Sequence, residues 1–309
     1  MTYAQMAEVV EKCQSMCRNF GRRLCFSITG GDPILNPDFW PLLELLHKKR
    51  IIFSIMGNPF HLDESVCRRL KEMGCRRYQM SLDGLEKTHD WFRKPGSFRE
   101  TLSKIKCLND AGIRTIIMTT VSDKNIDEIP DIIDTVVAHQ VGTFSFARYC
   151  PTKGEQEIGI TPLRYRELLQ KCDQKFKAYQ AKGVSTYFNL KEHLWALYRY
   201  ETGEFKIPKD AQKGIIYDGC NCANCHLTIL PNGDIFACRR FESKVGNIFT
   251  DSLSDIWLHK MECYRNYDQF QKCSKCELLA WCRGCPAVAY GTTGSFYGAD
   301  PQCWKEVKD

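Results

Sequence analysis

The apolar positions in the first half of the chain alternate between helical stripes and short apolar runs. Tyr3, Met6, Val10, Cys13 and Cys17 recur at steps of three and four, which predicts an amphipathic helix. Runs rich in apolar and β-branched residues predict strands at 24–29, 51–56, 77–82, 113–121 and 142–147, with helical stripes between them. Strands that alternate with helices are typical of parallel strands joined by right-handed crossovers. The pattern therefore predicts an α/β fold, either a doubly wound sheet or a partial barrel.

The pattern changes after the fifth predicted strand. Longer helical stripes cover 163–181 and 190–200, with a short strand possible at 184–188, and a cysteine-rich region opens near residue 218. We expect a barrel-like domain over 1–155, a helical bridge over 156–217 and a small C-terminal domain over 218–309.

Composition narrows the class of protein. The 309 residues are 43% hydrophobic, enough to bury a sizeable core. No apolar run approaches the roughly 18 residues that a membrane span needs. The 43 basic and 37 acidic residues are scattered, as on solvated helix faces. We therefore expect neither a membrane nor a nucleic acid as a partner. The N-terminus lacks the pattern of a signal peptide, which indicates a cytoplasmic location.

Ten of the eighteen cysteines lie in the last ninety residues. Nine of them are regularly spaced: Cys220, Cys222, Cys225, Cys238, Cys273, Cys276, Cys282, Cys285 and Cys303. In a cytoplasmic protein such clusters indicate metal ligands rather than disulfides. A Cys-x2-Cys-x5-Cys-x2-Cys run suits zinc about as well as an iron–sulfur cluster. His226 and His259 could also ligate zinc.

Short polar motifs follow several predicted strands. Thr29-Gly30-Gly31-Asp32-Pro33 follows the first, and Ser81 and Asp83 follow the third. Val121 and Arg148 occupy corresponding places after the next two strands. Because parallel sheets bind ligands at the carboxyl ends of their strands, these motifs are candidate ligand contacts.

In this order, the motifs resemble those of the radical S-adenosylmethionine (SAM) enzymes, above all in the stretch from Ser81 to Phe98. The terminal cysteines resemble the SPASM auxiliary-cluster domain of that family. The resemblance covers nearly the whole chain and implies a partial parallel (β/α)6 barrel lacking its first strand, followed by a SPASM domain. It also implies a SAM site. There the motif at 30–33, next to Thr29, would hold the methionine amino group, Ser81 and Asp83 would lie near the ribose, and Val121 and Arg148 near the adenine or carboxylate.

The family holds its catalytic 4Fe-4S cluster on a Cys-x3-Cys-x2-Cys loop after the first barrel strand. Cys13 and Cys17 match the first half of this motif, but Phe20 stands at the third position. Both cysteines also lie on the apolar stripe of the first helix, so we interpret them as helix core. We expect the chain to start inside the first barrel helix, with a third, catalytic cluster encoded upstream and this chain alone inactive. The coding sequence upstream of Met1 would test this.

By resemblance to the SPASM pattern, one auxiliary 4Fe-4S cluster would be held by Cys273, Cys276, Cys282 and Cys303. The other would take Cys220, Cys238 and Cys285, with Cys222 or Cys225 as the fourth ligand. The family usually places three residues before its penultimate cysteine, whereas only two separate Cys282 from Cys285. Cys263 matches no position in the pattern and is expected to be packing. The full set of matched cysteines favours iron and sulfur over zinc.

The resemblance implies radical chemistry, in which a reduced cluster cleaves SAM and the resulting radical takes a hydrogen atom from the substrate. SPASM enzymes mostly act on peptides, so a ribosomally synthesised peptide or protein is the expected substrate, with a reductase or flavodoxin as electron donor. Arg239 stands where the sulfatase-maturing branch carries an aspartate. This favours peptide crosslinking or epimerisation. The alternative is a non-catalytic iron–sulfur or zinc-binding scaffold that binds a peptide or partner protein.

Overall fold

The computed structural model describes residues 1–152 and 159–307. The chain forms two compact units. The first contains Met1–Ala147 and Gln174–Asn189, and the second contains Arg148–Asp173 and Leu190–Asp309. The expected boundary at residue 155 lies outside the described residues. The three-part division at 155 and 217 therefore stays a prediction.

The first unit is built on a six-stranded parallel sheet in which the strands follow one another in chain order. The strands are β1 (Cys25–Ile28), β2 (Ile52–Met56), β3 (Arg77–Ser81), β4 (Arg114–Val121), β5 (Thr143–Arg148) and β6 (Tyr187–Phe188). Each of the five predicted strands is present, and the short sixth falls within the possible strand at 184–188. The predicted α/β class with parallel strands is confirmed.

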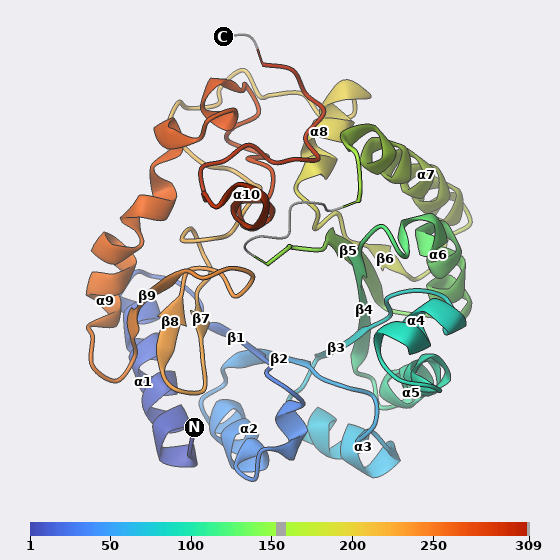
Figure 1. Ribbon diagram of the computed structural model, residues 1–309. Coiled ribbons are helices and arrows are strands. Elements are labelled where there is room, and N and C mark those ends of the chain that lie inside the picture. Colours follow the sequence, from blue (N-terminus) through green and yellow to red (C-terminus); the bar gives the residue numbers. More distant parts are fainter. Residues whose placement is uncertain (153–158, 308–309) are drawn as a thin grey trace. The chain divides into compact units, whose positions relative to one another are not determined.

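Helices connect these strands and line one side of the curved sheet in Figure 1. They are α1 (Tyr3–Asn19), α2 (Phe39–Lys48), α3 (Glu64–Glu72), α4 (Glu86–Phe92), α5 (Ser97–Asp110), α6 (Ile129–Ala138) and α7 (Pro162–Ala181). The last turns of α7 belong to the first unit, where Lys175 and Tyr179 both contact Asp134 of α6. The helix α4 was not expected from the sequence, because its seven residues carry too short an apolar stripe to show a period.

The core of this unit follows from the strand pattern. Every residue of β5 is buried, as in a parallel strand covered on both faces. Along β2 and β3, buried residues alternate with partly exposed ones, so Phe53, Ile55, Tyr78 and Met80 supply one apolar face. The strands are thereby fixed in register, which places all their carboxyl ends at one edge of the sheet.

The first helix packs through the stripe that the sequence predicted. Val9, Val10 and Cys13 are its buried residues, whereas Cys17 is partly exposed. Burial raises the pKa of the Cys13 thiol to about 12, and the neighbouring Cys17 adds to this shift. A thiol held neutral in a helix core agrees with the interpretation of Cys13 as packing.

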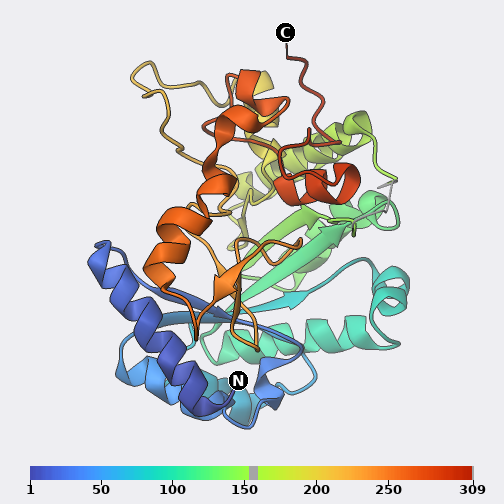
Figure 2. The same ribbon diagram turned by 60° about the vertical axis from the view of Figure 1, so that its left-hand side comes forward.

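The second unit contains little regular structure, as its orange-to-red part shows in Figure 2. Its strands form a small antiparallel sheet of β7 (Thr228–Ile229), β8 (Asp234–Phe236) and β9 (Lys244–Asn247). Its further α-helices are α8 (Leu194–Glu201), α9 (Leu253–Asp255) and α10 (Pro286–Thr293). Short helical turns lie at Ile256–Lys260, Glu262–Arg265, Tyr267–Gln269 and Cys273–Lys275. Across the described ranges, no helix is both long and apolar enough to cross a membrane.

Among the longer strands of the sheet, β1 should have the amide hydrogens that are least protected from exchange. In the part of the chain that the structure describes, β1 pairs only with β2, whereas β4 lies between β3 and β5. Residues of β1 are also exposed or half-buried. We expect amide hydrogens of Cys25–Ile28 to exchange faster than those of Arg114–Val121, because edge amides open without breaking the core. Hydrogen exchange with mass spectrometry measures this, and equal protection of both strands would contradict it.

Candidate cofactor-binding sites

The loop after β1 is shaped by two glycines with left-handed backbone angles. Gly30 has a φ of +110° and Gly31 a φ of +52°, values that residues with a side chain rarely adopt. A Cβ at either position would meet nothing within 4 Å in this structure. The loop therefore leaves open space beside bare backbone, which is what close approach of a ligand to backbone oxygens requires.

Asp32, the next residue, carries an unused hydrogen-bond acceptor. Its side chain is 3% exposed, and its Oδ2 atom is buried without a hydrogen-bond partner. The Oδ1 atom accepts a long hydrogen bond of 3.5 Å from the Asn58 amide, and His61 Nε2 lies 3.8 Å from Oδ2. Burial raises the pKa of this carboxyl, against the opposing effects of Asn58 and His61. A buried acceptor of this kind suits an ammonium group, so the residues present fit the amino group of SAM.

Asp83, after β3, is already fully engaged within the loop. Its Oδ2 accepts a hydrogen bond of 3.0 Å from Arg93 Nε, and its Oδ1 accepts one of 2.9 Å from the Thr120 amide. Asn125 Nδ2 donates to the carbonyls of Asp83 and Thr120, both at 2.8 Å. The polar residues after β3 and β4 therefore brace each other. Ser81 is half-buried at the end of β3.

The sheet brings together most of the predicted SAM contacts. Thr29 to Pro33, Ser81 and Val121 follow or end strands β1, β3 and β4, at the same edge of the sheet in the first unit. Val121 is fully buried. Arg148, the last residue of β5, belongs to the second unit, as do its side-chain partners.

In the second unit, four predicted ligands line one pocket. The pocket is lined by Cys273, Cys276, Cys282 and Cys303, together with Leu197, Leu278, Leu279, Arg283, Gly284 and Lys305. The sequence separates these thiols by up to thirty residues, and the fold brings them to one cavity. We call Cys273, Cys276, Cys282 and Cys303 the second cysteine set.

The short spacing between Cys282 and Cys285 is made possible by two left-handed residues. Arg283 has a φ of +61° and Gly284 a φ of +59°. The Gly284 amide donates to Cys282 Sγ at 3.4 Å, a bond that would stabilise a thiolate. Cys282 faces the pocket, whereas Cys285 packs in a different cluster with Ala287 and Val288. The turn thus sends two cysteines that are close in sequence to two different sites.

The other site gathers around Cys285. Cys238 packs against its cluster, and Arg240 Nη1 donates to Cys285 Sγ at 3.6 Å. Burial raises the pKa of Cys220 to about 12, with the Cys285 and Cys238 thiols adding to the shift. Burial and the same neighbouring thiols also raise the pKa of Cys222. We call Cys220, Cys222, Cys238 and Cys285 the first cysteine set.

Two cysteines behave differently from expectation. Cys225 is exposed and only burial shifts its pKa, so the contacts favour Cys222 over Cys225 as the fourth ligand. Cys263 is also exposed, on the short turn Glu262–Arg265. The prediction that Cys263 packs in a core was therefore wrong, because this turn leaves the thiol at the surface.

The contact of Cys150 with the first cysteine set was not expected from the sequence. This thiol packs against Cys285 beside Cys238, and its hydrogen bond holds the pKa of Cys285 below the ordinary thiol value. Cys150 lies far from the other cysteines in sequence and belongs to no spacing pattern. Its place two residues after β5, where strand-exit residues gather, was the one available signal.

The positions of the candidate ligand side chains bear on whether they suit a zinc ion or an iron–sulfur cluster. Within 1–152 and 159–307, no three Cys, His, Asp or Glu side chains converge as they would around a single ion. Zinc–thiolate bonds are about 2.3 Å long, so four zinc ligands crowd together. The four thiols of the second set line one pocket without converging on a single point, which suits a cluster better than a single ion. The candidate zinc ligands His226 and His259 are both exposed.

Comparison with known families gives two matches along the chain. The Radical SAM superfamily matches residues 2–136, and the SPASM iron–sulfur cluster-binding domain matches residues 220–286. The first match covers the strands that carry the SAM-site motifs, and the second covers both cysteine sets except Cys303.

Individual relatives agree with this division. An AdoMet-dependent heme synthase of Methanosarcina barkeri is 26% identical over 89% of this chain and 81% of its own length. The mycofactocin maturase MftC of Mycobacterium ulcerans is 26% identical over 94% of this chain and 78% of its own. The fold is similar to that of Streptococcus suis SuiB bound to S-adenosylmethionine, with a TM-score of 0.73 and 21% identity over 98% of this chain and 70% of SuiB.

SuiB bound to its precursor peptide SuiA is similar as well, with a TM-score of 0.72 and 19% identity over 98% of this chain and 69% of that one. The fold thus agrees with that of these solved structures, and the cysteine spacing agrees with the matched families except between Cys282 and Cys285. Those families imply 4Fe-4S clusters as cofactors, and SAM is bound in the similar structures. The chain therefore carries a Radical SAM domain at residues 2–136, followed by a SPASM iron–sulfur cluster-binding domain at residues 220–286.

Proposed function

We propose that this protein is a radical SAM enzyme that modifies a ribosomally synthesised peptide or protein and holds two auxiliary 4Fe-4S clusters. The observation that carries the proposal is the pocket lined by Cys273, Cys276, Cys282 and Cys303. The first cysteine set, centred on Cys285, would hold the other auxiliary cluster. A domain division at 155 and 217 and a cytoplasmic location, where reduced thiols persist, belong to the same proposal.

In this proposal the chain's own residues bind and orient. Gly30 and Gly31 leave backbone open beside the methionine end of SAM, and Asp32 Oδ2 accepts a hydrogen bond from its ammonium group. Arg240 donates to the Cys285 thiolate and offsets its charge. When bound, SAM and the reduced clusters would supply radical hydrogen abstraction and electron transfer, fed by a reductase or flavodoxin.

A peptide is the favoured substrate because relatives with this domain order are named as peptide maturases. MftC is one, and SuiB binds the precursor peptide SuiA. Arg239 follows the Gly-x4-Cys cysteine directly, where it would bind an acidic group rather than remove a proton. We therefore favour crosslinking or epimerisation over sulfatase maturation.

A second candidate substrate is a haem precursor, because heme synthases are among the relatives that cover most of this chain. The non-catalytic scaffold remains the alternative from another class. It differs from both enzymes in needing no SAM, so a test of SAM binding separates scaffold from enzyme.

Iron content tests the two cysteine sets. Anaerobic reconstitution of the chain should give about eight irons, four for each cluster. Cys276→Ala should lose about half of the iron and lower the melting temperature, since ligand loss removes metal-coupled folding energy. Cys225→Ala is the matched control, because this exposed cysteine lies outside both sets, and it should keep all the iron. Iron and sulfide assays measure this; zinc without sulfide would contradict the cluster assignment.

SAM affinity tests the role of Asp32. Asp32→Asn should weaken SAM binding by about ten- to hundred-fold, the loss expected for a hydrogen bond between charged groups. Asp123→Asn, which changes an exposed carboxylate paired with Lys124, is the control and should bind normally. Because burial raises the pKa of Asp32, wild-type affinity should start to fall at a higher pH on acidification than for an exposed aspartate. Equal affinities in calorimetry would remove Asp32 from the site.

Co-expression tests the substrate class. A form of the protein that carries a Cys-x3-Cys-x2-Cys cluster loop should convert a precursor peptide encoded beside the gene, with loss of two hydrogen atoms for a crosslink or inversion at one residue without a mass change. Residues 1–309 contain no Cys-x3-Cys-x2-Cys motif, so this chain alone is the control and should leave the peptide unchanged. Mass spectrometry and chiral amino-acid analysis report the outcome. Conversion of a haem precursor but of no peptide would favour the second candidate.

A further inference from the structure

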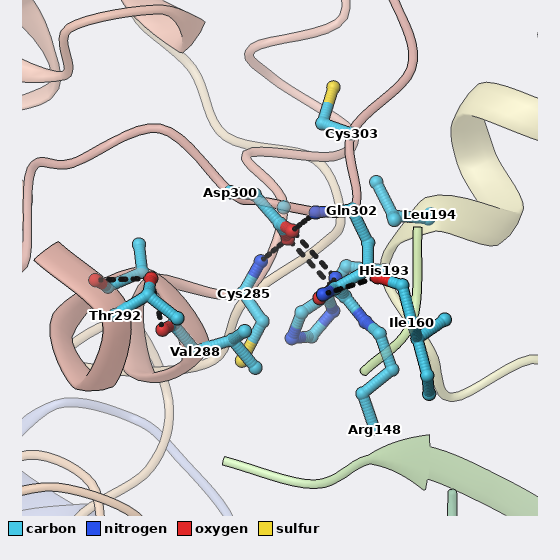
Figure 3. A network of polar contacts seen from close by, with 12 residues as sticks. Arg148, Ile160, His193, Leu194, Cys285, Val288, Thr292, Asp300, Gln302 and Cys303 are labelled. Atoms are coloured by element: carbon cyan, nitrogen blue, oxygen red, sulfur yellow. Dashed lines mark hydrogen bonds and ion pairs between the residues drawn. The ribbon is translucent and has the colours of Figure 1, made fainter. Parts of the chain in front are cut away.

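Among residues 1–152 and 159–307, Arg148 is the largest fully buried side chain. Its guanidinium makes a two-pronged contact with Asp300, with Nη1 donating to Oδ1 at 2.6 Å and Nη2 to Oδ2 at 2.8 Å. Nη1 also donates to Gln302 Oε1 at 2.8 Å, and Nη2 to Glu192 Oε1 at 2.8 Å. Figure 3 shows Asp300 and Gln302 meeting the buried guanidinium of Arg148.

Asp300 extends the network to both cysteine sets. Its Oδ2 accepts a hydrogen bond of 2.7 Å from the Cys285 amide, and its carbonyl accepts one of 3.1 Å from the Cys303 amide. Its Oδ1 accepts a further one of 3.0 Å from the Gln302 amide. Cys285 belongs to the first set and Cys303 to the second, so a single aspartate fixes the backbone of one ligand from each.

Close packing leaves the aspartate little freedom. A Cβ at Gly284 would lie 2.6 Å from Asp300 Oδ2, so the left-handed turn before Cys285 can approach the carboxylate only as glycine. Figure 3 places Cys285 and Cys303 on either side of Asp300. The position of the carboxylate therefore sets the position of both loops.

The charges make Arg148 indispensable to this arrangement. The side chains of Glu192 and Asp300 are each 2% exposed and share this one cation. Burial alone would raise the pKa of Glu192, but the charge of Arg148 lowers it to about 2. Without the guanidinium, two buried carboxylates would face each other unpaired, and such a site rearranges or takes up protons and water.

From these contacts we infer that Arg148 is a positioning residue that holds Asp300 and thereby orients Cys285 and Cys303, one ligand from each auxiliary cluster. This inference rests on the proposed function only in taking the two cysteine sets as cluster ligands. It gives Arg148 a role distinct from the SAM contact that the family resemblance implies. Loss of Arg148 should disturb both clusters together, although the residue touches neither thiol.

Arg240 provides the comparison. Its Nη1 donates to Cys285 Sγ, and its Nη2 donates to the Arg148 carbonyl. Within the described residues, the hydrogen bonds of Arg240 reach the first set and Arg148 but not the second set, so its removal should affect the first cluster alone. Cys276→Ala provides the converse case, because Cys276 lines only the pocket of the second set.

The experiment compares Arg148→Gln, Arg240→Gln and Cys276→Ala after anaerobic reconstitution of the same chain. Iron and sulfide are counted, and electron paramagnetic resonance of the reduced protein records the two cluster signals. Arg148→Gln should shift or weaken both signals and lose more iron than the roughly four atoms of one cluster. Arg240→Gln should change one signal and Cys276→Ala should abolish the other.

A merely structural role gives a different result. If Arg148→Gln lowers the melting temperature but keeps both signals and all the iron, the inference is wrong. If Arg148→Gln does not accumulate as folded protein, Asp300→Asn decides, because it keeps the side-chain size and removes the charge that Arg148 holds. Asp300→Asn should shift both signals, and unchanged signals overturn the inference. If the unaltered chain binds no iron and sulfide, the proposed function fails instead.

Discussion

The ion pair between Arg148 and Asp300 is the contact on which the order of the second unit depends. Both side chains are almost completely buried, and their closest atoms are 2.6 Å apart. A buried pair gains stability from further hydrogen bonds to its polar atoms, and here Glu192, Gln302 and the Cys285 amide supply such bonds, whereas Arg148 Nε is buried without a partner. The ion pair therefore fixes the positions of the cysteine loops in a region with few helices and strands.

Arginines perform a similar task elsewhere in the unit. Arg283 donates to the carbonyls of Leu279 and Cys220, at 3.1 and 2.8 Å, and so ties two cysteine loops together. Arg265 donates to the Ala223 carbonyl at 2.7 Å, next to Cys222. A planar guanidinium offers several donors in fixed directions, which suits carbonyls that no sheet partner can reach. In these cysteine loops, hydrogen bonds from arginine side chains thus take the place of the backbone hydrogen bonds of a sheet.

The fold could be predicted from the sequence because local periodicity is strong in the first unit. Each long strand appears within a residue or two of its expected bounds, since apolar runs between amphipathic stripes have few other structures open to them. The resemblance to the SPASM pattern implied the grouping of Cys273, Cys276, Cys282 and Cys303, and these four thiols line one pocket. By contrast, the contact of Cys150 with Cys285 and the exposure of Cys263 were not anticipated. Both depend on tertiary contacts between loops, which leave no periodic trace in the sequence.

The same limit explains why the buried partners of Arg148 could not be predicted from the sequence. Its position at the end of a strand was visible in the sequence, but its partners Glu192 and Asp300 lie 44 and 152 residues away. A strand-exit arginine pointing to a ligand and one pointing to a buried carboxylate look alike in a sequence. Only the fold distinguishes them, because it alone shows which charges are buried together.

The members of the two cysteine sets interleave along the chain. Cys285 of the first set lies between Cys282 and Cys303 of the second, across the turn at Arg283 and Gly284. The two sites therefore cannot be exchanged, deleted or inherited as separate modules, because any segment that contains one of them contains part of the other. During synthesis the ribosome releases the last thiol of the first set before the last thiol of the second. The first cysteine set therefore has all its thiols available during synthesis before the second set does.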